Sequence, residues 1–438
     1  MTTTMRALLG ATALCAAGGI AAAQDKTTLT IATVNNGDMI RMQGMTDSFL
    51  EANPDIALEW VTLEENVLRQ RVTTDIATGG GQYDVMTIGT YEVPIWAKQG
   101  WLVSLSDLPE EWDADDLLPA VAEGLTVDGE LYAAPFYGES SMVMYRTDLM
   151  EEAGLEMPEE PTWEFIREAA AAMTDRDAEI YGICARGKAG WGENTAFLTA
   201  MANSFGAKWF DEDWNAQFDQ QPWKDTLEFY VGMMNESGPP GASGNGFNEN
   251  LALFQQGKCG MWIDATVAAS FVTNPDDSVV ADKVGFALAP DTGLGKRGNW
   301  LWAWSLGIPA GTDAEEAAKK FVAWATSKEY TEMVAEAEGW ANVPPGTRTS
   351  LYENEEYAQV PFAEMTLRSI QSADPTNPTV DPVPYTGIQF VAIPEFQGIG
   401  TAVGQQFSAA LAGTTSIDDA LANAQALTVD EMEDAGYN

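Results

Sequence analysis

The sequence predicts an α/β fold divided into two lobes, with the chain passing between the lobes three times. Strand-like and helix-like segments alternate along the chain, an order typical of largely parallel sheets covered by helices. A chain of 438 residues with 45% hydrophobic content is long enough to bury two cores. Breaks rich in proline and glycine near residues 137, 290 and 344 divide it into four pieces, too many for two sequential domains. We therefore expect a cleft between two lobes, where a small ligand would bind.

The N-terminal segment has the pattern of a secretion signal. Arg6 is its only charged residue, an alanine-rich apolar stretch follows, and three alanines (residues 21–23) precede Gln24 as a cleavage site requires. The stretch is too short and too rich in small residues for a membrane anchor, and no later stretch is long and apolar enough to span a bilayer. Residues 1–23 are therefore predicted to be a signal peptide, and the mature chain is expected to be exported.

The charge balance excludes several classes of partner and chemistry. The formal net charge is −44, which argues against nucleic acid or an anionic membrane as a partner. The chain contains no histidine, which excludes Ser-His-Asp and Cys-His catalysis and histidine-based metal sites. We expect no metal or other cofactor. Cys184 and Cys259 remain after removal of the signal peptide, and they are either one disulfide or two buried thiols.

The first lobe begins with a strand over residues 28–34, followed by an Asn-Asn-Gly-Asp turn and a helix that reaches Phe49. Residues 57–63 form the next predicted strand, residues 65–80 a helix that ends at two glycines, and residues 83–89 a third strand. The apolar face of the second helix is expected to hold Val67, Leu68, Val72 and Ile76. This order predicts a largely parallel sheet.

The segment over residues 131–146 is rich in strand formers and is interrupted by Pro135 and Gly138, as expected where the chain crosses between lobes. Further predicted elements are helices over residues 163–173, 196–205 and 222–235, and a strand, turn and helix over residues 257–268.

Capping patterns mark the remaining helices. Thr312 and Glu315 form a predicted capping box for one helix from Ala314 to about Ala337. From Gly404 onward, two helices are separated by Gly413, and Ser416 is expected to cap the second.

Residues 181–194 (YGICARGKAGWGEN) combine chemistry suited to a hydroxylated ligand. A short strand leads into a glycine-rich loop that carries two cations, one aromatic ring, a carboxylate and an amide: Arg186, Lys188, Trp191, Glu193 and Asn194. An aromatic ring packs on C–H faces, and charged groups make paired hydrogen bonds to neighbouring hydroxyls. The alternative is an ordinary strand-to-helix connection with solvated charges. On these residues alone, both interpretations stay open.

Several longer segments of the chain resemble extracytoplasmic solute-binding proteins of ABC sugar importers, in the maltose-binding branch. They include TLTIATVNNGDMIRMQ, YDVMTIGTYEVPIWAKQGWLVSL, PTWEF, FQQGKCGMWIDATVA and NWLWAWSLGIPAG. Within that branch, NNGDMIRMQ, YGICARGKAGWGEN and GMWIDATVA are similar to the sorbitol- and mannitol-binding (polyol) proteins. The resemblance covers essentially the whole mature chain.

The resemblance implies the two-lobed periplasmic-binding-protein fold of type II, with a ligand cleft between lobes joined by a hinge of several chain crossings. The N-terminal lobe is expected over residues 24–137 and 291–344, and the C-terminal lobe over residues 138–290 and 345–438. It also makes Cys184, beside the ligand loop, the expected disulfide partner of Cys259.

The resemblance further implies ligand-binding roles for residues from both lobes. They are Asn36, Asp38, Met39, Tyr91, Glu92, Tyr137, Glu139, Arg186, Lys188, Trp191, Glu193, Asp264, Trp300 or Trp302, Gln389 and Phe396. Trp191 would stack on the ligand, and Arg186 and Lys188 would bind its hydroxyls. Asp38 and Asp264 could instead be helix caps. Trp300, Trp302 and Trp304 alternate along one strand, so they share a face that is more often core than site.

The function implied is that of a periplasmic binding protein that captures a small ligand by lobe closure and delivers it to the membrane permease of an ABC importer. Charged groups outnumber aromatics in the expected site loops, which favours a sugar alcohol such as mannitol, sorbitol or a pentitol. The alternatives are a mono- or oligosaccharide ligand, presentation of the ligand to a chemoreceptor, and an exported glycoside hydrolase. With 66 acidic residues, a carboxylate pair occurs by chance and does not support the hydrolase. We expect a monomer that is not an enzyme.

Overall fold

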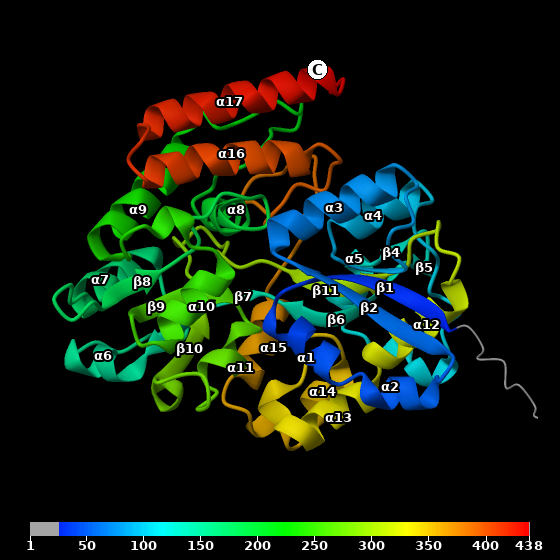
Figure 1. The fold of residues 1–438 in the computed structure, drawn as a ribbon. Coiled ribbons are helices and arrows are strands. Elements are labelled where there is room, and N and C mark those ends of the chain that lie inside the picture. Colours follow the sequence, from blue (N-terminus) through cyan, green and yellow to red (C-terminus); the bar gives the residue numbers. More distant parts are fainter. Residues whose placement is uncertain (1–25, 438) are drawn as a thin grey trace, which may run out of the picture.

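The computed structural model describes residues 26–437 and contains two sheets, each with its own helices (Figure 1). The predicted signal peptide, residues 1–23, lies outside the described residues. None of the helices within the described range is long and apolar enough to cross a membrane.

The first lobe is built on a five-stranded sheet with strand order β2-β1-β3-β11-β6. Its strands are β1 (Thr27–Val34), β2 (Ile56–Leu63), β3 (Val85–Ile88), β6 (Ala133–Glu139) and β11 (Trp302–Gly307). Strands β2, β1 and β3 are parallel, whereas β11 runs antiparallel to both β3 and β6. The parallel sheet predicted for this lobe is therefore confirmed for three strands, and the late strand β11 enters it in the opposite direction.

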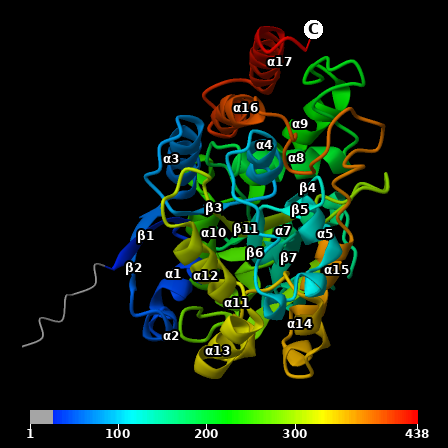
Figure 2. The same cartoon turned by 90° about the vertical axis from the view of Figure 1, so that its right-hand side faces the viewer.

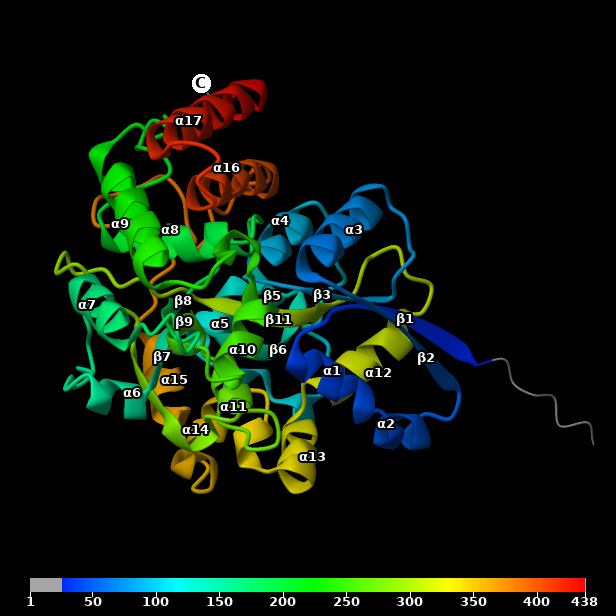
Figure 3. The same cartoon turned by 60° about the vertical axis from the view of Figure 1, so that its left-hand side comes forward.

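Helices cover both faces of this sheet, and α3 and α12 lie on opposite sides of β1 (Figures 1 and 3). The helices of the first lobe are α1 (Gly37–Gly44), α2 (Asp47–Ala52), α3 (Glu65–Ala77), α4 (Glu92–Lys98), α5 (Pro119–Gly124), α12 (Glu315–Ala325) and α13 (Lys328–Glu338). A small hairpin of β4 (Thr126–Val127) and β5 (Glu130–Leu131) precedes β6.

The second lobe is built on a four-stranded sheet with strand order β10-β7-β9-β8. Its strands are β7 (Ser141–Arg146), β8 (Tyr181–Cys184), β9 (Cys259–Ala265) and β10 (Val284–Leu288). Only β8 and β9 are parallel, and β7 runs antiparallel to both β9 and β10, so this sheet is mixed.

The second lobe has more helices than the first, and Figure 3 shows α6, α7 and α9 on the far side of its sheet from β1 and β2. They are α6 (Thr147–Glu152), α7 (Trp163–Met173), α8 (Asn194–Ser204), α9 (Gln221–Ser237), α10 (Phe247–Gln255), α11 (Ala268–Val272), α15 (Ala363–Gln371), α16 (Phe396–Leu411) and α17 (Ile417–Asp434). Helices α16 and α17 lie side by side at one end of the molecule (Figures 1 and 2). The short helix α14 (Thr349–Glu353) follows α13.

The chain passes between the sheets where one strand ends and the next begins in the other sheet. Strand β6 ends at Glu139 and β7 begins at Ser141, and the chain returns between Leu288 of β10 and Trp302 of β11. A third passage follows α13, before α15 packs against β7 and β10. The predicted two-lobed fold is thus confirmed, and these passages bring side chains from both lobes together.

Most predicted elements are confirmed, and the exceptions have local causes. The helix predicted from Ala314 to Ala337 is two helices, because the hydroxyl of Ser327 accepts a hydrogen bond from the Tyr330 backbone N–H and begins a second helix. The predicted capping box is also wrong, since the Thr312 hydroxyl donates to Asp84 instead and accepts only from the Ala314 N–H. The helix predicted to reach Phe49 is likewise split into α1 and α2.

The apolar face predicted for α3 is correct for Leu68, Val72 and Ile76, which are buried, and wrong for Val67, which is exposed. The predicted cap of α17 is confirmed, because the Ser416 hydroxyl accepts from the Asp419 backbone N–H at 3.1 Å.

A disulfide bond joins Cys184 and Cys259, and both residues are fully buried. The bond closes a loop between residues 75 positions apart in the sequence. The closed loop contains α8, α9 and α10, so the bond restrains this part of the chain in the unfolded as well as the folded state.

We expect thiol titration of the denatured, unreduced mature protein to detect no free thiol, and two after reduction. Replacing both cysteines with alanine should lower the free energy of unfolding by roughly 2–4 kcal/mol, because a long loop is no longer closed in the unfolded chain. Reduced wild-type protein is the matched control for this loss of stability, because it lacks the bond but keeps both cysteine side chains. Two free thiols before reduction would contradict the bond.

Candidate ligand-binding site

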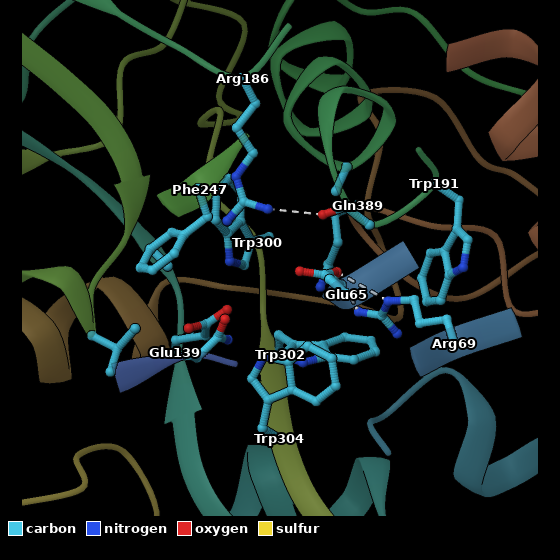
Figure 4. Close-up of a pocket in the computed structure, with 15 residues that line it drawn as sticks. Glu65, Arg69, Glu139, Arg186, Trp191, Phe247, Trp300, Trp302, Trp304 and Gln389 are labelled. Atoms are coloured by element: carbon cyan, nitrogen blue, oxygen red, sulfur yellow. Dashed lines mark hydrogen bonds and ion pairs between the residues drawn. The ribbon is translucent and has the colours of Figure 1, made fainter. Parts of the chain in front are cut away.

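A cavity of about 460 Å³ lies between the two lobes and is lined by side chains from both (Figure 4). The lining residues are Asn36, Glu65, Arg69, Glu139, Arg186, Trp191, Gly192, Ala196, Phe247, Ala265, Val267, Trp300, Trp302, Trp304 and Gln389.

The first lobe presents its cavity residues at the ends of its strands. Asn36 follows β1, Glu65 begins the helix after β2, and Glu139 ends β6. The carboxyl ends of neighbouring parallel strands meet at one edge of a sheet, which is where ligands of α/β folds bind. Trp302 and Trp304 come from β11, which runs in the opposite direction and so begins at this edge.

Arg69 is the cation of the first lobe in the cavity wall, and its side chain is held on all sides. Its guanidinium donates to Glu65 at 2.8 Å and to Glu92 at 2.8 Å. It also lies over three indole rings, with its central carbon 4.0 Å from the ring centre of Trp191, 4.7 Å from Trp302 and 4.6 Å from Trp304. Ion pairing and cation–π contact therefore fix this guanidinium in one orientation.

Arg186 is the corresponding cation of the second lobe. It makes a two-pronged contact with Asp264, with N–O distances of 2.6 and 2.9 Å, and donates to the Gly192 carbonyl at 2.8 Å. Its central carbon lies 5.4 Å from the ring centre of Phe247 and 5.7 Å from that of Trp300. Burial alone would lower the pKa of Arg186, but the carboxylates of Asp264 and Glu193 raise it above the ordinary value, so the cation is permanent.

Two buried carboxyl groups, Glu139 and Glu193, lie near these cations. The nearby positive charge offsets only part of the cost of burying their ionised forms. Burial raises the pKa of Glu139 to about 8, although the charge of Arg186 opposes the shift. Burial also raises the pKa of Glu193 to about 8. Glu139 lines the cavity, so its carboxyl group can accept or donate a hydrogen bond to a ligand near neutral pH.

Three further polar atoms of the cavity wall lack partners. The indole nitrogens of Trp191 and Trp302 and the amide oxygen of Gln389 are buried and have no hydrogen-bond partner among residues 26–437. Buried polar atoms are rarely left without a partner, because an unmade hydrogen bond costs about 1–3 kcal/mol. The cavity thus offers fixed donors and acceptors together with aromatic faces, as a small molecule with many hydroxyl groups requires.

A larger cavity of about 1000 Å³ lies nearby, behind Leu301 and Phe390. Its wall is mostly apolar, and its two carboxylates, Glu123 and Asp374, are exposed. It lacks the buried charges that distinguish the first cavity.

The structure brings seven of the residues expected at the ligand to the cavity wall. They are Asn36, Glu139, Arg186, Trp191, Trp300, Trp302 and Gln389. The sequence leaves Trp300 and Trp302 as alternatives, and both line the cavity together with Trp304, which is not among the expected ligand-binding residues.

Several other expected residues lie directly behind the wall and support it. Glu92 and Asp264 hold Arg69 and Arg186, and the hydroxyl of Tyr137 accepts from the Asn36 amide at 2.9 Å. The ring of Tyr91 packs 4.7 Å from that of Trp191, and its hydroxyl donates to the Ile393 carbonyl. Phe396 packs on the same two rings.

The remaining expected residues lie outside the cavity wall, where they form ion pairs or pack in the core. Asp38 is buried against Arg41, and burial raises its pKa to about 6; it is not a helix cap. Met39 is fully buried in the first lobe's core. Lys188 makes an ion pair with Glu64 at 2.6 Å, and Glu193 lies between Arg186 and Lys188.

Sequence reasoning missed Glu65 and Arg69, interpreting their helix only by its apolar face. A usable signal existed: a Glu and an Arg four positions apart, in the first turns of a helix that directly follows a strand. Phe247, Ala196, Ala265 and Val267 carry no such signal. Gly192 is explained by close approach, because a Cβ atom there would lie 2.2 Å from a Glu65 carboxylate oxygen of the other lobe.

Two lobes that enclose a polar, aromatic cavity at their junction define the class of two-lobed ligand-binding proteins. The chain belongs to the family described as "Bacterial extracellular solute-binding protein", whose model matches residues 36–332.

Individual relatives are similar over nearly the whole chain. A mannitol-binding protein of Pseudomonas aeruginosa is 58% identical over 415 residues, which are 95% of each chain. The crystal structure of an ABC transporter solute-binding protein of Agrobacterium vitis S4 with bound D-mannitol is 73% identical, with a TM-score of 0.93 over 94% of this chain and 99% of that one. A solute-binding protein of Agrobacterium radiobacter K84 in complex with ribitol is 24% identical with a TM-score of 0.81, which shows the fold alone.

We expect the stability of the ligand-free protein to fall as pH rises through the range 5 to 8. A carboxyl group whose pKa is raised on folding contributes stability that is complete below its unfolded value, 4.5 for Glu139, and is lost as pH approaches about 8. Glu139→Gln should remove the contribution of this carboxyl group to the pH dependence. The slope of unfolding free energy against pH should then be shallower by up to about 1.4 kcal/mol per pH unit.

The slope is measured by urea unfolding at several pH values. Glu236→Gln, on the exposed surface, is the matched control and should keep the wild-type slope. Equal slopes for Glu139→Gln and wild type would contradict the buried carboxyl.

Proposed function

We propose that this protein is the periplasmic binding component of an ABC importer and that its ligand is a sugar alcohol, D-mannitol first among the candidates. The observation that carries the proposal is the convergence of two fixed guanidinium groups, one from each lobe, with three unpartnered polar atoms around a small cavity. The mannitol-binding relatives support the same ligand.

The chemistry of the wall suits an acyclic polyol. Adjacent hydroxyl groups on such a chain match the paired N–H groups of an arginine and the paired oxygens of a carboxylate. The indole and phenyl rings from Trp191, Trp300, Trp302, Trp304 and Phe247 offer faces for its C–H bonds. Arg69, Arg186 and Glu65 supply the charged partners, and Glu139 adds a carboxyl group that can accept or donate a hydrogen bond.

Lobe closure would bury the ligand, and the closed form would then deliver it to the permease. For this motion we propose two rigid bodies close to the expected lobes, residues 26–139 with 291–344 and residues 140–290 with 345–437, because β6 pairs with β11 as far as Glu139. Micromolar affinity corresponds to about −8 kcal/mol, which a few charge-assisted hydrogen bonds and stacked rings can supply.

We expect D-mannitol to bind the purified mature protein with micromolar or tighter affinity by calorimetry, and to raise its melting temperature by mass action. Sorbitol, ribitol, glucose and maltose complete the panel. If only the sugars bound, the polyol assignment would fail, and turnover of an aryl glycoside would restore the hydrolase alternative.

Two substitutions test the cavity wall. Glu139→Met should weaken mannitol binding about 5- to 100-fold, because a ligand hydroxyl left without its hydrogen-bond partner costs about 1–3 kcal/mol. Trp302→Phe, which keeps an aromatic ring but removes the unpartnered N–H, should weaken binding about fivefold. Trp340→Phe, at a tryptophan whose N–H contacts Glu356 away from the cavity, is the matched control. Unchanged affinity in both test variants would place the ligand elsewhere.

A further inference from the structure

The loop after β8 meets the first turn of α3 across the junction of the lobes, at one side of the ligand cavity. Lys188 of the loop contacts Glu64 with its amine nitrogen 2.6 Å from a carboxylate oxygen, and the Asn66 amide donates to the Ala189 carbonyl at 3.3 Å. None of these residues lines the cavity. They form a set of contacts between lobes that is separate from the ligand.

The geometry of Gly190 shows how close this approach is. A Cβ atom at Gly190 would lie 2.4 Å from the side-chain oxygen of Asn66, and its three nearest neighbours all belong to Asn66. The backbone of Gly190 does not adopt a positive φ, so alanine is compatible with its conformation. The side chain nearest to that added Cβ atom therefore belongs to the other lobe.

Both sides of the contact are held firmly by their own lobes. The backbone N–H groups of Gly187 and Lys188 donate to the Asn245 carbonyl, and the Asn194 amide donates to the Gly404 carbonyl. On the first lobe, the second carboxylate oxygen of Glu64 caps α3 by accepting from the Asn66 and Val67 backbone N–H groups. The same helix carries Glu65 and Arg69 into the cavity.

We propose that Glu64, Asn66, Lys188 and Gly190 form an interlobe latch that holds the lobes closed and sets the rate of ligand release without touching the ligand. Lys188 is thus a positioning residue, not the hydroxyl-binding group that the sequence suggested. The inference rests on the proposed function, since it concerns the closed state that encloses the same ligand. The latch has an electrostatic part and a steric part. The ion pair between Lys188 and Glu64 stabilises the closed state, and the missing side chain of Gly190 leaves room for Asn66 when the lobes meet.

The test is stopped-flow release of D-mannitol, followed by tryptophan fluorescence. Lys188→Met should speed release about threefold to tenfold while changing the association rate less than twofold, because partly exposed ion pairs contribute modestly and mostly to dissociation. Lys188→Arg should restore slow release. Added salt should speed release from wild type but not from Lys188→Met.

Gly190→Ala tests the steric part. The added methyl group displaces the Asn66 side chain only when the lobes are closed, so release should be faster while the melting temperature of the ligand-free protein stays the same. Gly44→Ala, where a Cβ would meet nothing within 4 Å, is its control. Lys258→Met is the control for the charge, because Lys258 pairs with Glu179 at 2.7 Å within one lobe.

Release from Lys188→Met and Gly190→Ala at the rate of the two controls would overturn the latch. If wild-type protein bound no mannitol, the proposed function would fail instead. The latch is then tested by the same release measurements with whichever of sorbitol, ribitol, glucose and maltose binds, and release from both variants at the rate of their controls would overturn it.

Discussion

The pairing of each cavity arginine with carboxylates behind it is the interaction on which the site depends. A guanidinium taken out of water without a partner is strongly destabilising, so Arg69 and Arg186 can lie in a buried wall only because Glu92 and Asp264 compensate them. This compensation also uses up part of each arginine's donors and fixes its orientation. What remains points into the cavity in a defined direction, ready for a ligand.

The aromatic rings add a second constraint of the same kind. Trp191, Trp302 and Trp304 surround Arg69, so the rings that offer faces to a ligand also orient the cation. Trp191 comes from the second lobe and Arg69 from the first. A contact that shapes the wall is therefore also a contact between lobes, and the cavity takes its full form only when the lobes meet.

Much of this architecture could be predicted from local pattern. The alternation of strands and helices, the breaks at the crossings and the loop after β8 all indicated a two-lobed ligand-binding protein, and the loop supplied two residues that line the cavity, Arg186 and Trp191. The same local reasoning failed for α12 and α13. A serine such as Ser327 can cap a helix or lie within one, and only the path of the folded chain shows that a new helix begins there. It failed for Glu65 and Arg69, because a charged pair on a helix is ordinarily solvated.

The sequence by itself determined the fold class, most elements and the chemical inventory of the site, because periodicity, caps and glycine-rich turns act over a few residues. Only the tertiary structure decided which charges face the cavity, which stand behind it and which join the lobes. Asp264 holds Arg186 from 78 positions away, and Glu64 meets Lys188 from 124 positions away. Such pairings depend on how two sheets are placed against each other, and no local pattern records that.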